Sequence, residues 1–149
     1  MMEFYRSTFK TVLFAIIMQI TIASCTPSEQ MLDFSFEQQK AGVPFTFAEY
    51  CKETYDSIYL IFPYDPEEGT QNLPYRMSNS LRNESSCTLD DTYTTVLFIR
   101  DGVVEAYSRI TYDKAVFTTP ALPEDIHIYP FDQQFVISGE KYKEVSLYR

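Results

Sequence analysis

The strongest structural signal in the sequence is TTVLFIR-DG-VVEAYSRITY, residues Thr94 to Tyr112. It consists of two runs rich in β-branched and aromatic residues on either side of Asp101-Gly102. Aspartate and glycine both accept the positive φ angles of a type I′ turn, which joins the strands of a tight hairpin. We therefore predict an antiparallel hairpin at the centre of the fold, with Arg100 opposite Val103.

The two faces of this hairpin differ in composition. Pairing outward from the turn gives an entirely apolar row that we expect to face the core: Leu97 opposite Ala106, Ile99 opposite Val104, continuing to Ile110. The other face mixes charged and apolar residues: Val96, Phe98, Arg100, Glu105, Tyr107 and Arg109. Because an antiparallel sheet commonly packs one face on the core, we expect the mixed face to be only partly covered.

Further strands are predicted on both sides of the hairpin. Ser57 to Phe62 (SIYLIF) is a continuous apolar run, which is typical of a central strand covered on both faces. A short edge strand is expected over residues 115–119. A final hairpin is expected from Phe135–Ser138 and Lys143–Tyr148 across Gly139-Glu140, with its apolar residues Val145 and Leu147 facing inward.

Two short helices are predicted before the central hairpin. Thr46 and Glu49 have the spacing of a capping box, and Phe45 and Tyr50 occupy the positions of a hydrophobic staple, which predicts a helix over residues 47–54. Leucine and methionine recur at four-residue spacing later in the chain, at Leu73, Met77 and Leu81, which predicts a helix over residues 73–83. The pattern indicates an α+β domain: a mainly antiparallel sheet of four to five strands with two short helices on one face.

The N-terminal segment has the composition of an export signal. Arg6 and Lys10 precede an apolar run from Val12 to Ile22, and small residues follow. The run is about half the roughly 20 residues that a helix needs to cross a bilayer. The segment therefore predicts export rather than a permanent transmembrane helix.

Residues Ile22-Ala23-Ser24-Cys25 close that segment and resemble the lipobox of bacterial lipoproteins. The resemblance covers residues 1–25 and implies that Cys25 is diacylated, becomes the new N-terminus and is acylated again. It also implies a protein of the cell envelope, and we expect the outer membrane, facing the periplasm. Two or more acyl chains anchor a protein stably. Ordinary secretion, with Cys25 as a remaining thiol, is the alternative.

The lipobox divides the chain into a signal peptide (residues 1–24), a tether (25–32) and a single domain (33–149). Loss of Arg6, Lys10 and Glu3 with the signal changes the formal net charge from −9 to −10. Phosphate binding needs a basic surface, so nucleic acid is not an expected partner. The acidity indicates either a basic protein partner or solubility alone.

Cys51 and Cys87 are the two cysteines left after lipidation. In an oxidising compartment an even pair permits a disulfide, and two buried thiols are the alternative. These cysteines and the lone His127 give no ligand pairs at metal-site spacing, so we expect no metal and no cofactor.

Catalytic motifs in the sequence are weak. Ser138 and Lys141 match S-x-x-K, but a hairpin turn is predicted there instead of the helix that this motif needs. The acidic pair Asp90-Asp91 and the acidic loop, Asp65 with Glu67 and Glu68, are the remaining carboxylate groups. A hydrolase is therefore the least favoured function class.

Tyrosine is abundant, with 12 in the chain and no tryptophan. It favours strands, but it also supplies rigid contact area at binding surfaces. We take the acidic loop and its flanking tyrosines as the candidate contact surface: Tyr64, Asp65, Glu67, Glu68 and Tyr75.

The leading function is a lipid-anchored, non-enzymatic protein-binding module. Small, acidic, lipid-anchored α+β domains without catalytic residues are similar in general type to some inhibitor or immunity proteins that act against antibacterial toxins. A structural or assembly accessory of an envelope complex is the alternative.

Overall fold

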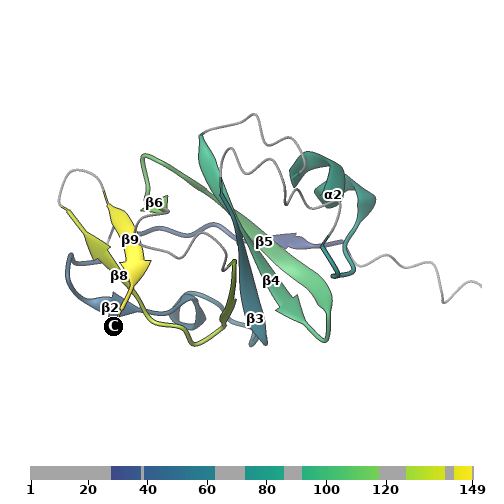
Figure 1. The fold of residues 1–149 in the computed structure, drawn as a ribbon, viewed down its shortest axis with the longest axis horizontal. Helices are drawn as coiled ribbons and strands as arrows, with labels where there is room; N and C mark the ends of the chain where they lie inside the picture. Colours follow the sequence, from purple (N-terminus) through teal and green to yellow (C-terminus); the bar gives the residue numbers. More distant parts are fainter. Residues whose placement is uncertain are drawn as a thin grey trace, which may run out of the picture.

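The computed structural model describes residues 28–37, 39–62, 73–85, 92–117, 127–139 and 143–148. These residues form two sheets that pack around one aromatic core (Figure 1). The first sheet has the order β1 (Gln30–Met31), β5 (Val103–Thr111), β4 (Tyr93–Arg100), β3 (Ser57–Ile61), β7 (Ile128–Pro130). The second has the order β2 (Pro44–Phe45), β8 (Phe135–Ser138), β9 (Glu144–Leu147), β6 (Val116–Phe117). The helical elements are η1 (Phe47–Glu49) and α2 (Asn79–Ser85).

The predicted fold class holds only in its coarse form. Helices and sheets are both present, but strands dominate and there are two sheets where we predicted one. Each sheet is also mixed, because β1 runs parallel to β5 and β6 runs parallel to β9. The prediction missed the second sheet because β2 has only two residues, too few for an alternating pattern to be visible in the sequence. The pairing of β6 with β9 also joins residues far apart in the chain.

The central hairpin is confirmed. β4 pairs with β5, with Arg100 opposite Val103 and Ile99 opposite Val104. Asp101 and Gly102 have φ angles of 51° and 70°, the positive values that a type I′ turn requires. The Asp-Gly dipeptide therefore sets the turn and the register next to it.

The predicted register fails beyond Ile99. A β-bulge shifts the pairing between Phe98 and Ile99, so that Phe98, and not Leu97, lies opposite Ala106. Glu105 is the extra residue on β5. A bulge of this kind reverses which residues of the bulged strand share a face.

Both faces of the hairpin are buried. The face that we expected to be partly covered carries Val96 and Phe98, which are fully buried in the main core together with Ala106 and Ile110. The face that we expected to pack on the core forms a second, smaller cluster with Leu97, Ile99 and Val104. A sheet buried on both faces needs covering layers on each side.

The main core lies between the two sheets and is built from aromatic rings. Phe47 of η1 is fully buried at its centre and packs edge-on against rings from both sheets. Its neighbours at ring-centroid distances of 5.4–6.4 Å are Phe34, Phe45, Phe98, Phe117 and Phe135. Such pairs add to the free energy gained by burial, and they fix the relative position of the elements that carry them.

The second cluster lies on the opposite face of the first sheet, beneath α2. Leu81 of α2 is buried against Tyr59 and Ile61 of β3. The two helical elements therefore cover opposite faces, which corrects the prediction that both pack on one face. η1 packs on the main core through Phe47, and α2 packs on the second cluster through Leu81.

Both helices are shorter than predicted. The expected helix over residues 47–54 is the single 3-10 turn η1, although the staple contact between Phe45 and Tyr50 is present at 6.0 Å. The expected helix over residues 73–83 begins only at Asn79, where the Ser78 hydroxyl caps it by accepting from the Leu81 N–H at 3.1 Å.

The chain before α2 pairs with the hairpin instead of coiling. The Arg76 N–H donates to the Gly102 carbonyl at 3.0 Å, and the Val104 N–H donates to the Arg76 carbonyl at 2.8 Å. These bonds occupy the backbone groups that a helix would use within itself. Tertiary pairing thus overrides the four-residue spacing of Leu73, Met77 and Leu81.

Three predicted elements are borne out. β3 lies between β4 and β7 and is buried from Ile58 to Ile61, as a central strand should be. The final hairpin forms from β8 and β9, with Val145 fully buried and Leu147 packed against the main core. The short strand near residue 116 forms as β6.

The N-terminal end of the described chain belongs to the sheet. Gln30 and Met31, which we assigned to the tether, pair with Ala106 and Tyr107 of β5. The Leu32 N–H continues the pairing by donating to the Tyr107 carbonyl at 2.8 Å. One residue earlier, the carboxylate of Glu29 accepts a hydrogen bond from the Ser78 N–H. Residues 29–32 are therefore held against β5 and the start of α2.

Candidate contact surface

Tyr75 is the one member of the candidate contact surface within the described residues. It is half-buried, and its ring packs edge-on against Tyr59 at 6.2 Å, in the second cluster. The Tyr75 side chain therefore helps to cover the sheet and is also partly exposed to solvent. Tyr64, Asp65, Glu67 and Glu68 lie outside the described residues.

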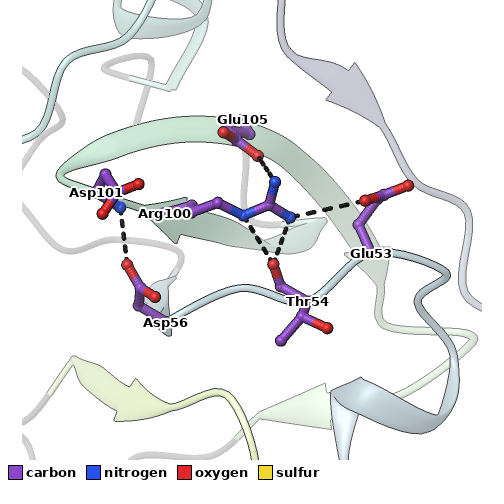
Figure 2. Close-up of polar contacts among 6 residues, drawn as sticks. All are labelled: Glu53, Thr54, Asp56, Arg100, Asp101 and Glu105. Atoms are coloured by element: carbon purple, nitrogen blue, oxygen red, sulfur yellow. Dashed lines mark hydrogen bonds and ion pairs between the residues drawn. The ribbon is translucent and has the colours of Figure 1, made fainter.

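A polar cluster around Arg100 lies at the turn of the central hairpin (Figure 2). The Arg100 guanidinium donates to the Thr54 carbonyl, at 2.8 Å from Nε, and pairs with Glu105 at 3.1 Å and Glu53 at 3.8 Å. Its plane also lies over the Tyr55 ring, 5.2 Å from the centroid. Four different contacts satisfy this one cation.

The same region is tied by a second contact. The Asp101 N–H in the hairpin turn donates to the Asp56 carboxylate at 2.7 Å, as Figure 2 shows. Asp56 directly precedes β3, so this bond and the Arg100 contacts join residues 53–56 to the hairpin. The chemistry of the cluster is therefore structural: the arginine is engaged by carboxylates and a carbonyl and holds the strand β3 in place.

Arg109 belongs to a second arginine–tyrosine group on β4 and β5. Its guanidinium lies 5.2 Å from the centroid of Tyr93 and 5.7 Å from that of Tyr107. Such contacts stabilise by roughly 0.5–1 kcal/mol at exposed positions. Tyr107 and Arg109 are two residues apart on β5 and so share a face, which the sequence indicates. Their partner on β4, Tyr93, depends on the register shifted by the bulge, which the sequence does not indicate.

Within the described residues Cys51 has no disulfide partner, and its side chain is half-buried beside the main core. Burial raises the pKa of the Cys51 thiol to about 11, because the thiolate is poorly solvated there. Cys87 lies outside the described residues, so the disulfide between the two stays a prediction. The raised pKa is typical of an unreactive thiol and not of a nucleophile.

His127 is buried at the edge of the first sheet. Its Nδ1 lies 3.1 Å from the Leu60 carbonyl oxygen, and its ring stacks on Tyr59 at a centroid distance of 5.6 Å. The Phe62 ring covers it from another side at 5.5 Å. These contacts give His127 a packing role on β3.

Of the other residues considered for catalysis, the structure describes only Ser138. Ser138 is exposed at the end of β8, and its hydroxyl lies 3.5 Å from the Glu144 carbonyl oxygen across the hairpin. Lys141 and the pair Asp90-Asp91 lie outside the described residues. Within the described ranges, no group of three or more histidine, cysteine or acidic residues is arranged to hold a metal ion.

A shallow hollow of about 420 Å³ opens at the end of β5, lined by Thr92, Thr111, Tyr112 and Asp113. A hydrogen bond from Thr111 lowers the pKa of the Asp113 carboxyl, so that carboxyl remains ionised. No sequence motif points to this hollow, because Thr92 precedes β4 whereas the other three residues lie at and after the end of β5.

Comparison with known proteins returns no match: no family model, curated protein or solved structure is similar to this chain. In the part of the chain that the structure describes, no helix is long and apolar enough to cross a membrane.

Proposed function

We propose that this chain is a lipid-anchored envelope protein that acts, without catalysis, as a protein-binding module. The inhibitor or immunity type is its concrete form. Cys25 carries the acyl chains, and the domain faces the periplasm from the outer membrane.

One observation carries the proposal: a lipobox-like motif ends at Cys25, and the folded sheet begins at Gln30, five residues later. A domain that starts directly after the acylated cysteine fits a protein whose signal ends there. The acidic charge and the abundance of tyrosine support a protein partner, because tyrosine supplies contact area at low entropic cost.

The contact surface is proposed at Tyr64, Asp65, Glu67, Glu68 and Tyr75. Rim charges mainly steer association, whereas a buried aromatic anchor contributes about 2 kcal/mol or more. Glu67→Lys with Glu68→Lys should therefore slow association with a partner captured from an envelope extract. Tyr64→Ala should weaken capture by about 30-fold, which corresponds to that energy.

The structure changes which tyrosine provides the cleaner test. Tyr75 packs on Tyr59, so Tyr75→Ala removes core packing along with any contact to a partner. Tyr75→Phe keeps the ring and serves as the matched variant. If the charge-reversed and Tyr64→Ala proteins fold and capture the same partner at wild-type affinity and rate, this contact surface is wrong.

The alternative is an accessory of an envelope complex, and the identity of the captured partner distinguishes the two. A toxin domain captured by the wild type and lost by the charge-reversed variant supports the inhibitor type. A resident envelope protein supports the accessory role.

A further inference from the structure

Met31 is the most exposed large apolar side chain on the described surface, with 58% of its area accessible. It lies on β1, the outer strand of the first sheet, only six residues after Cys25. Figure 1 shows β1 and α2 at one end of the molecule and β2, β8 and β9 at the other. An exposed methionine next to a membrane anchor raises the question of which surface faces the bilayer.

The length of chain between the anchor and the fold limits the answer. Glu29 is held by its bond to the Ser78 N–H, and Gln30 by its pairing with Ala106. Four peptide units separate Cys25 from Glu29, and fully extended they span at most about 14 Å. If Cys25 is acylated, Glu29 therefore lies within about 14 Å of the bilayer surface.

Two orientations are incompatible with that limit. β1 and β7 are the two edges of the five-stranded sheet, and four strand spacings put them about 19 Å apart. Along the strands, Glu29 is level with Glu105, and Thr111 lies six residues, about 20 Å, further on. Resting the domain on β7, or on the end of β5 that leads to the second sheet, would lift Glu29 beyond the reach of the chain.

We propose that the β1 edge is a membrane-contact surface, with Met31 at the interface of the bilayer that holds the acyl chains of Cys25. This inference rests on the proposed lipid anchor. The partner is the lipid surface itself, and the second sheet is turned away from it. A methionine at this position adds apolar contact to the anchor because its flexible thioether side chain adapts to an irregular surface.

The absence of tryptophan from the sequence allows a direct test. Single tryptophans are introduced by Met31→Trp and, as the matched control on the opposite edge, by Ile128→Trp, where the native residue is 45% exposed. A second pair, Gln30→Trp and Tyr148→Trp, repeats the comparison with the second sheet as the control. Each full-length protein is purified from membranes and reconstituted into phosphatidylcholine vesicles with and without bromine on the acyl chains.

Brominated lipid should quench the fluorescence of the Met31→Trp and Gln30→Trp proteins and leave the Ile128→Trp and Tyr148→Trp proteins near their unquenched intensity. Equal quenching of the two members of each pair in acylated protein would overturn the membrane-contact surface and leave the anchor intact. Protein that carries no acyl chain by intact mass would contradict the anchor, and this inference with it.

Discussion

Arg100 shows how a single residue can determine the geometry of this fold. The guanidinium binds the Thr54 carbonyl and the Glu105 carboxylate and covers the Tyr55 ring. Glu105 is the extra residue of the β-bulge, so the cluster links the irregularity of β5 to the segment before β3. The planar, forked guanidinium can make these contacts together, whereas an ammonium group cannot.

Replacing Arg100 should therefore destabilise the protein. Arg100→Ala removes hydrogen bonds to a carbonyl and a carboxylate, and we expect a loss of about 1–2 kcal/mol after allowance for partial exposure. Lys114→Ala is the matched control, because the Lys114–Asp33 pair at 2.7 Å lies on the surface and should contribute less than about 1 kcal/mol. Urea unfolding measures both. Equal losses for the two variants would mean that the Arg100 cluster has no special role.

The Cys51 thiol gives a prediction for pH dependence. Because its pKa is raised to about 11, the thiolate fraction at pH 8 is about 100-fold smaller than that of an unperturbed thiol. A more basic thiolate is also more nucleophilic, so alkylation should be about tenfold slower. The rate should rise about tenfold for each pH unit up to roughly pH 11. Iodoacetamide labelling of the reduced Cys87→Ser protein, followed by mass spectrometry, measures it. A rate that levels off near pH 9 would contradict the burial of the thiol.

Among the secondary-structure elements, the sequence predicted correctly those that are set by neighbouring residues. Asp101-Gly102 predicted the turn, and the apolar run from Ser57 predicted a central strand. The bulge could not be predicted, because the alternating sequence pattern is compatible with both registers, with and without Glu105 as an extra residue. The helix over residues 73–83 was wrong in its first half because Arg76 bonds to the hairpin, a pairing set by tertiary structure.

Substitution of Gly102 tests the geometry of the hairpin turn. Gly102 has φ +70°, and an added Cβ would meet no atom within 4 Å, so the cost of Gly102→Ala comes from the backbone alone. We expect a loss of about 1–2 kcal/mol in unfolding free energy. Gly102→Asn should lose less, because asparagine adopts the left-handed conformation more readily. A neutral Gly102→Ala variant would show that the turn does not need a positive φ.

For the whole molecule, the sequence predicted individual strands better than their arrangement into two sheets. Tyr75 was expected on a contact surface beside the acidic loop, but its ring also packs against Tyr59 in the second cluster. The second sheet and the parallel strand β1 depend on pairing between residues far apart in the chain, such as Gln30 with Ala106. Single-sequence patterns carry no information about such pairing.

The folded domain begins at Gln30, five residues after Cys25, so the proposed function depends on the lipid anchor. The test of the anchor is to express the wild type and Cys25→Ala in a bacterium that makes lipoproteins. The cells are grown with labelled fatty acid. We expect label to enter the wild-type protein, which should float with the membranes, and we expect Cys25→Ala to abolish both labelling and cleavage of the signal. A wild-type protein that remains unlabelled and is recovered soluble from the periplasm would contradict the anchor.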